Sequence, residues 1–188
     1  NSSLRDLGTG TSTTLVVAEI RDQQVRTFHI GDSSAWICGQ RGVMKLQTTP
    51  HSPVGFALEA GFVNEKEALH HEDLNLLSNV VGSADMRIEI GSRLPLAPKD
   101  TLLIASDGLF DNVLESEIVE IIRTGSVADC LLQLWQLTAR RMAGTAKTKP
   151  SKPDDFSAIL LRPTATANGS ANGATNGGAT PTNPPNSG

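Results

Sequence analysis

The sequence predicts an α+β domain in which helices pack on a mainly antiparallel sheet system. Three observations support this fold class. Strand-like runs rich in β-branched residues occur near both ends of the chain, only short turns separate the early runs, and amphipathic helical patterns follow residue 114. The 188 residues are enough for one mid-sized domain and too few for two.

Four strands are expected in the first part of the chain. Residues 13–20 are rich in β-branched side chains, and residues 24–30 alternate polar and apolar side chains as a half-buried strand does. Residues 35–38 and 43–47 follow, separated by a Gly-Gln-Arg-Gly turn. We expect these four segments to form one antiparallel meander.

The middle of the chain is less regular. Residues 50–61 mix Pro, Gly and Ala, and we expect no regular structure there. Asn64 and Glu67 have the spacing of a capping box, which predicts a short helix reaching about His70. Residues 86–90 alternate again and predict another strand.

The last third predicts a strand, two helices and a final strand. Residues 101–105 form a near-continuous apolar run, which is typical of a buried strand. A helix over 115–123 has acidic residues in its first turn and ends at a glycine. Ser126 is a cap for a longer amphipathic helix, and residues 156–161 complete the domain.

The chain divides into a folded part, 1–163, and a low-complexity end, 164–188. The 25 residues of that end are drawn only from Thr, Ala, Asn, Gly, Ser and Pro. Such a segment cannot bury enough apolar surface to offset its ordering entropy, so we expect a disordered tail or linker. The first residue is Asn1 rather than Met, from which we expect a fragment or a processed product.

The composition argues against several classes of protein. Acidic residues outnumber basic ones by 20 to 16 and no long basic run occurs, which disfavours a nucleic-acid or anionic-membrane surface. The only cysteines, Cys38 and Cys130, do not suit a disulfide framework or a Cys/His zinc site. The longest apolar runs are too short to span a bilayer. We expect no membrane insertion and a cytoplasmic location.

Three aspartates lie at strand ends. Asp32 follows the strand at 24–30, Asp107 follows the strand at 101–105, and Asp154 precedes the last strand. If the last strand runs antiparallel to the other two, all three carboxylates fall on one edge, where a hard cation such as Mg²⁺ or Mn²⁺ is needed to offset their repulsion. Taken singly, each of them is better explained by ordinary turn chemistry than by a role as a metal ligand.

Two further residues have plainer interpretations. Asp111 is expected to be a turn or cap residue. His29 is expected to be a core or surface residue of its strand rather than a metal ligand.

Four motifs occur in order along the chain. They are Gly10-Thr-Ser-Thr-Thr14, His29-Ile-Gly-Asp-Ser-Ser-Ala35, Ala105-Ser-Asp-Gly-Leu-Phe-Asp111 and Pro153-Asp-Asp-Phe-Ser-Ala158. Together they resemble the metal-dependent Ser/Thr protein phosphatases of type 2C, bacterial members most closely, over nearly all of residues 8–162.

The resemblance implies a catalytic site with bound metal. Asp107 and Asp154 match catalytic ligands of a binuclear centre, and Asp32 matches a ligand of a third, weaker site. Two or three Mg²⁺ or Mn²⁺ ions would then activate a water that hydrolyses phosphoserine or phosphothreonine. The segment 50–77 matches a flap beside the active site.

The implied fold is a sandwich of two antiparallel β-sheets flanked by helices, and it is N-terminally incomplete. The family's Asp-Gly-His-Gly-Gly motif and its upstream phosphate-binding Arg are absent from these 188 residues. The resemblance therefore implies a chain that is weakly active or inactive by itself.

Three hypotheses about function remain open. The first is a phosphatase that acts on phosphoproteins, with a Ser/Thr kinase or its targets as candidate partners, and that is a monomer when complete. The second is a non-catalytic phosphatase-like binding or regulatory module. The third is a phosphatase of a partner-switching stress pathway, which shares the fold.

Overall fold

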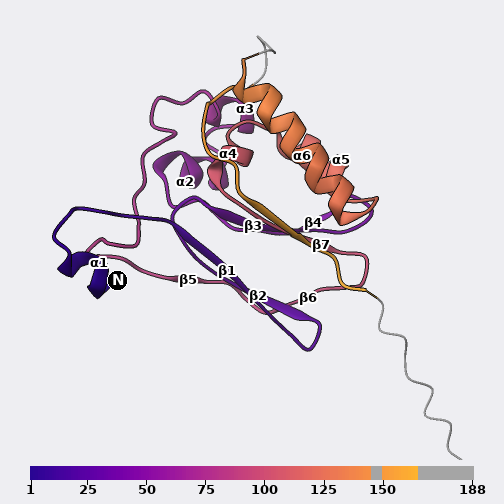
Figure 1. The fold of residues 1–188 in the computed structure, drawn as a ribbon, viewed down its shortest axis with the longest axis horizontal. Coiled ribbons are helices and arrows are strands. Elements are labelled where there is room, and N and C mark those ends of the chain that lie inside the picture. The colour runs from indigo at the N-terminus through magenta and orange to yellow at the C-terminus, as the bar shows by residue number, and fades with distance from the viewer. Residues whose placement is uncertain (145–149, 165–188) are drawn as a thin grey trace, which may run out of the picture.

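A computed structural model of the chain describes residues 1–144 and 150–164, and contains two four-stranded antiparallel sheets (Figure 1). The first sheet contains β1 (Leu15–Arg21), β2 (Gln24–Ile30), β5 (Glu89–Ile90) and β6 (Leu94–Pro95). The second contains, in spatial order, β4 (Met44–Gln47), β3 (Ser34–Cys38), β7 (Thr101–Ala105) and β8 (Ala158–Leu161). The helices are α1 (Ser2–Asp6), α2 (Pro53–Glu59), α3 (Glu65–Ala68), α4 (Asp107–Phe110), α5 (Glu115–Ile122) and α6 (Val127–Met142). The α+β class with two antiparallel sheets is confirmed.

The expected single meander is wrong, because its strands belong to two sheets. β1 and β2 form a hairpin in the first sheet, whereas β3 pairs with β4 and β7 in the second. The burial patterns explain the division: β2 alternates buried and half-buried residues, but all five residues of β3 are buried. A strand buried on both faces needs a sheet on one side and helices on the other, and only the second sheet offers both.

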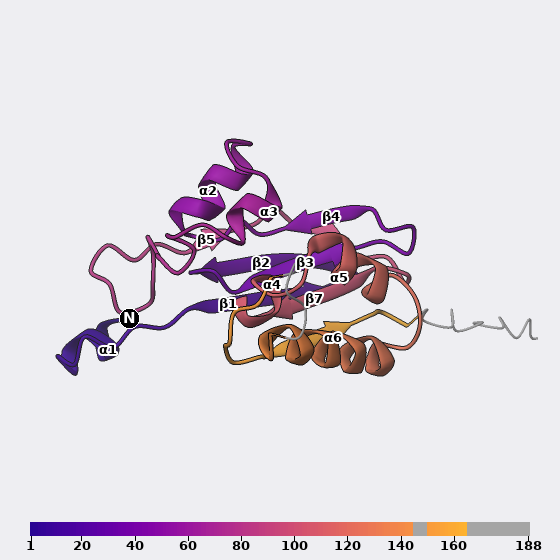
Figure 2. The ribbon, with the colours of Figure 1, turned by 90° about the horizontal axis from the view of Figure 1, so that it is seen from above.

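The core has two parts, one on each face of the second sheet. Successive residues of a strand point to opposite faces, so Leu102 packs toward the first sheet and Leu103 toward the helices. The cluster between the sheets consists of Val25, Ile37, Leu96 and Leu102. The cluster under α4, α5 and α6 consists of Trp36, Cys38, Leu103, Ala105, Leu109, Val113, Ile118, Ile122 and Leu134. Figure 2 shows α5 and α6 lying along β7 on this side.

Three short helices, α1, α2 and α4, were not expected from the sequence. α2 occupies most of the segment 50–61 that was expected to be irregular, because Ser52 caps it by accepting a hydrogen bond from the Gly55 N–H, and Pro53 occupies its first turn. α4 begins directly after β7. The predicted capping box of Asn64 is present, but α3 ends at Ala68.

The remaining elements follow the predictions closely. α5 ends before Gly125, whose φ of +82° is a left-handed conformation that favours glycine. Ser126 caps α6 by accepting a hydrogen bond from the Asp129 N–H. The strand predicted over 86–90 is reduced to β5. The predicted tail lies outside the described residues, apart from Thr164. No described helix is long and apolar enough to cross a membrane.

Candidate metal centre

The three predicted aspartates lie at one end of the second sheet. Ser34, Ala105 and Ala158 form one row across β3, β7 and β8. Asp32 lies two residues before Ser34, and Asp107 lies two residues after Ala105. Asp154 lies four residues before Ala158. Because β7 is antiparallel to both β3 and β8, all three positions are at the same end of the sheet. The sequence argument used the end of β2 to place Asp32, but the start of β3 is what brings it to the same edge as the other two.

A lysine lies among these carboxylates. Lys152 Nζ is 3.2 Å from Asp107 Oδ2, 2.6 Å from Asp111 Oδ2 and 3.4 Å from Asp154 Oδ2. The sequence argument missed Lys152 and assigned Asp111 only a turn or cap role. Asp111 is indeed the C-cap of α4, but it also lies four residues after Asp107, a spacing that brings two helical side chains to one face.

Burial perturbs the protonation of this cluster. It raises the pKa of Asp111 to about 6, against the opposing effect of the Lys152 ammonium. Burial and the charge of Asp107 raise the pKa of Asp32. Burial lowers the pKa of Lys152, but its hydrogen bond and ion pair with Asp111 outweigh this and hold the pKa above its usual range. Three carboxylates thus contact one ammonium group, and the charge of the same lysine also acts on Asp32. This all-oxygen donor set fits hard divalent cations such as Mg²⁺ and Mn²⁺.

The buried side chain of Asn112 connects the two segments that carry these residues. Its Nδ2 donates to Gly108 O at 2.9 Å and to Lys152 O at 2.8 Å, while its Oδ1 accepts from the Lys152 N–H at 2.7 Å. Ser106 Oγ adds a bond to Asp155 O at 3.2 Å. The start of α4 and the segment leading to β8 are therefore held together.

A second polar cluster contains His29, His51 and Glu89, whose ligand atoms lie within 4.8 Å of one another. Gly31 N–H donates to His51 Nδ1 at 3.1 Å, so the proton of the neutral His51 ring is on Nε2, which donates to Glu89 Oε2 at 2.9 Å. His29 Nε2 donates to Thr49 O at 2.9 Å. Of the four ring nitrogens, only Nδ1 of His29 has no hydrogen-bond partner. Because both nitrogens of His51 are already engaged, this cluster is better suited to holding the Asp32 loop than to binding metal.

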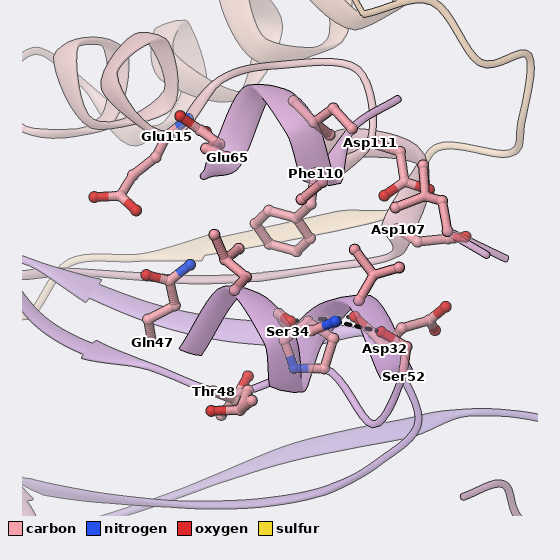
Figure 3. Close-up of a pocket in the computed structure, with 18 of the residues that line it drawn as sticks. Asp32, Ser34, Gln47, Thr48, Ser52, Glu65, Asp107, Phe110, Asp111 and Glu115 are labelled. Atoms are coloured by element: carbon pink, nitrogen blue, oxygen red, sulfur yellow. Dashed lines mark hydrogen bonds between the residues drawn. The ribbon is translucent and has the colours of Figure 1, made fainter. Parts of the chain in front are cut away.

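A cavity of about 370 Å³ adjoins the aspartates. Figure 3 shows Asp32, Asp107 and Asp111 toward one end, Glu65 and Glu115 toward the other, and Phe110 between them. The apolar residues of the lining are Trp36, Val54, Leu58, Ala68, Leu69, Leu74, Phe110 and Val113. The segment 50–77 therefore forms one wall of this cavity.

Glu65 contributes a hydrogen bond between that wall and the core. The Glu65 carboxylate at the start of α3 accepts from the Glu115 N–H, the first residue of α5. A carboxylate at a helix N-terminus is favoured by the helix dipole. Burial, and next the Glu65 charge, raise the pKa of Glu115. This contact fixes one side of the cavity.

Comparisons with known proteins agree with this architecture. Residues 6–147 match the family model described as Protein phosphatase 2C. Over 116 residues the chain is 34% identical to the serine/threonine phosphatase stp of Listeria innocua, which covers 61% of this chain and 45% of that protein. The serine/threonine phosphatase of S. agalactiae superposes with a TM-score of 0.70 at 25% identity, over 86% of this chain and 65% of that one.

A second structure supports the fold alone. The catalytic domain of the serine/threonine protein phosphatase PstP, in complex with two manganese ions, gives a TM-score of 0.66 at 20% identity, over 85% of this chain and 64% of that one. The chain spans about half the length of the curated relatives it matches. The family match covers well over half of the chain and includes Asp32 and Asp107, while Asp154 lies just beyond it. These 188 residues belong to the protein phosphatase 2C family.

Proposed function

We propose that this chain supplies metal ligands and the substrate-facing flap of a protein Ser/Thr phosphatase. The observation that carries the proposal is the group of carboxylates beside the ends of β3, β7 and β8, of which Asp32, Asp107 and Asp111 line one end of the cavity, in a chain of this family. Metal dependence is typical of the family, and bound cations would offset the repulsion among these carboxylates that the single charge of Lys152 leaves.

Asp107 and Asp154 are the residues proposed to hold two catalytic cations, Mg²⁺ or Mn²⁺, and Asp32 is proposed to contribute to a third site. When bound, such cations supply the Lewis acidity that lowers the pKa of water and offsets the charge of a phosphate ester. The chain's own contribution is positional: Asn112 and Ser106 fix Asp107 relative to the segment of Asp154.

The cavity is the proposed place for the substrate residue. Its carboxylate end would face the phosphorylated side chain, and its apolar walls would pack against the rest of the peptide while excluding water. Phosphoproteins are the proposed substrates, with a Ser/Thr kinase or its targets as candidate partners. A monomeric state for the complete domain and a cytoplasmic location remain proposals from the sequence.

The second candidate function is a non-catalytic phosphoprotein-binding module. One observation favours it: the Lys152 ammonium group already offsets part of the cluster's charge. In this alternative the cavity and flap bind a phosphoprotein without hydrolysing it.

Mn²⁺-dependent hydrolysis of a phosphothreonine peptide by the complete protein that contains this chain tests the proposal. Asp107→Asn should abolish turnover, since one ligand is lost while the side-chain volume is kept. Asp85→Asn, at an exposed site away from the cluster, is the matched control and should retain it. Near-normal turnover by Asp107→Asn would show that Asp107 is not a catalytic metal ligand. If the unsubstituted protein binds the phosphothreonine peptide without hydrolysing it, the result favours the second candidate.

A further inference from the structure

Lys152 combines a positive charge with a fixed position inside the acidic cluster. Its ammonium lies within 3.4 Å of one carboxylate oxygen each of Asp107, Asp111 and Asp154. Its side chain is only 24% exposed, so solvent screens these charges less than at an open surface. Neither the aspartate motifs nor the resemblance to the family assigned this lysine a role.

The backbone of Lys152 is fixed as firmly as that of the aspartates. Asn112, which is fully buried, accepts from its N–H and donates to its C=O. Pro153 follows directly and restricts the backbone of the lysine. The backbone from which the ammonium reaches the carboxylates is therefore already ordered, so forming the ion pairs orders the lysine side chain only.

A divalent cation bound by these carboxylates would be repelled by the Lys152 ammonium group. The Asp107 and Asp154 oxygens that contact Lys152 belong to the carboxylates proposed to hold the metal. Two cations cannot share these oxygens at contact distance without strong repulsion. Metal binding therefore requires the lysine side chain to give up some or all of its ion pairs.

We propose that Lys152 is an internal counter-cation that competes with divalent metal for the Asp107–Asp111–Asp154 cluster and thereby sets the metal affinity of the site. The proposal rests on the proposed metal-binding role of these aspartates. With metal absent, the lysine offsets the repulsion among the carboxylates and stabilises this end of the sheet. With metal present, the ammonium is displaced from these carboxylate oxygens.

Titration of the 188-residue chain with Mn²⁺, following free Mn²⁺ by electron paramagnetic resonance, tests the proposal without any need for turnover. Lys152→Met should lower the Mn²⁺ dissociation constant by about tenfold or more relative to Lys99→Met. Lys99 is exposed and distant from the cluster, so this control makes the same change in net charge. Lys152→Arg, which keeps the charge, should bind Mn²⁺ as weakly as the unsubstituted chain.

Thermal unfolding provides a second readout. Without metal, Lys152→Met should unfold at a lower temperature than Lys99→Met, because its carboxylates have lost their counter-charge. Saturating Mn²⁺ should raise the unfolding temperature of Lys152→Met more than that of the control. If Lys152→Met does not fold without metal, Lys152→Gln serves in its place, and folding on addition of Mn²⁺ supports the proposal.

The failures of the two proposals are distinguishable. Equal dissociation constants for Lys152→Met and Lys99→Met, together with loss of binding in Asp107→Asn, would overturn the role of Lys152 and leave the metal site in place. Unchanged Mn²⁺ binding in Asp107→Asn would overturn the metal site itself. Absence of Mn²⁺ binding in Lys152→Met would overturn the lysine proposal, because the freed carboxylates should then bind.

Discussion

Gly108 sets the separation between the segments that carry Asp107 and Asp154. A Cβ atom at this position would lie 2.2 Å from the Asp155 carbonyl oxygen, a backbone atom that cannot rotate away. The glycine of the Ser-Asp-Gly sequence is therefore required for packing, because any side chain would push α4 away from the strand that follows Asp154. The close approach of these two segments is what lets the carboxylates share one site.

Gly108→Ala should lower the free energy of unfolding by roughly 1–3 kcal/mol, as overpacking of a closed contact does. Chemical denaturation of the metal-free chain measures this. Gly39→Ala is the control, because an added Cβ there would meet its nearest neighbours at an ordinary 3.6 Å. Equal stability of the two variants would show that the contact is looser than the structure indicates.

His29 gives the fold a dependence on pH. Burial lowers its pKa below the usual 6.5, with the hydrogen bond to Thr49 acting against this, and its Nδ1 has no hydrogen-bond partner. The unfolded chain therefore takes up a proton at a higher pH than the folded chain does. The free energy of unfolding contributed by His29 is fully present above pH 6.5 and is lost as the pH falls below it.

His29→Gln, which cannot be protonated, should lose less stability than the unsubstituted chain between pH 7 and about 5. Denaturant melts across this pH range measure the effect. His70→Gln replaces an exposed histidine and should leave the slope unchanged. An identical slope in all three proteins would show that His29 titrates normally.

At the scale of elements, predictions succeeded where the signal was local. The sequence patterns that predicted β2 and β7 lie within a single strand each. The signals that predicted the caps of α3 and α6 lie within a single helical turn. The meander failed because strand pairing is decided by which faces must be buried, a long-range property. The helix α2 was missed because its Pro, Gly and Ala residues obscured the Ser52–Pro53 start signal.

The short helix α3 depends on a long-range contact for its position. Its carboxylate Glu65 bonds to the first N–H of α5, whereas its own length of four residues is too short for independent stability. Glu65→Ala should speed amide hydrogen exchange throughout α2 and α3 and leave α6 unchanged. Glu59→Ala, at the exposed end of α2, should have little effect. Unaltered exchange in Glu65→Ala would mean that the hydrogen bond between Glu65 and Glu115 does not hold the flap.

For the molecule as a whole, apolar surface remains exposed on the outer side of the first sheet. Leu15, Val17, Ile88 and Ile90 are 50%, 43%, 54% and 52% exposed. Among the described elements, no helix lies over this side, while α5 and α6 cover the second sheet (Figure 1). Contiguous apolar surface of this kind favours association.

The 188-residue chain alone should therefore self-associate at micromolar concentrations and above, as sedimentation velocity would show. Val17→Lys should reduce the association, since it places a charge in the middle of the exposed face. Lys99→Met is a control that leaves this face unchanged. A monomeric chain at all concentrations would contradict the expectation.

The candidate site was only partly predictable. Asp32, Asp107 and Asp154 could be identified because each adjoins a strand end and a family-like motif. Lys152 could not, because nothing in its local sequence indicates that Asn112, forty residues earlier, holds it against those carboxylates. The role of His51 in holding the Gly31 N–H is likewise visible only in three dimensions.

The central claim is that divalent cations bind at Asp107 and Asp154. Paramagnetic broadening of amide signals by substoichiometric Mn²⁺, in nuclear magnetic resonance spectra of the 188-residue chain, tests it most directly because weak binding suffices. The account predicts that broadening is centred on residues 106–111 and 154–157, and that Asp107→Asn greatly reduces it while Asp85→Asn does not. Broadening centred on His51 and Glu89, or spread evenly over exposed acidic residues, would contradict the account.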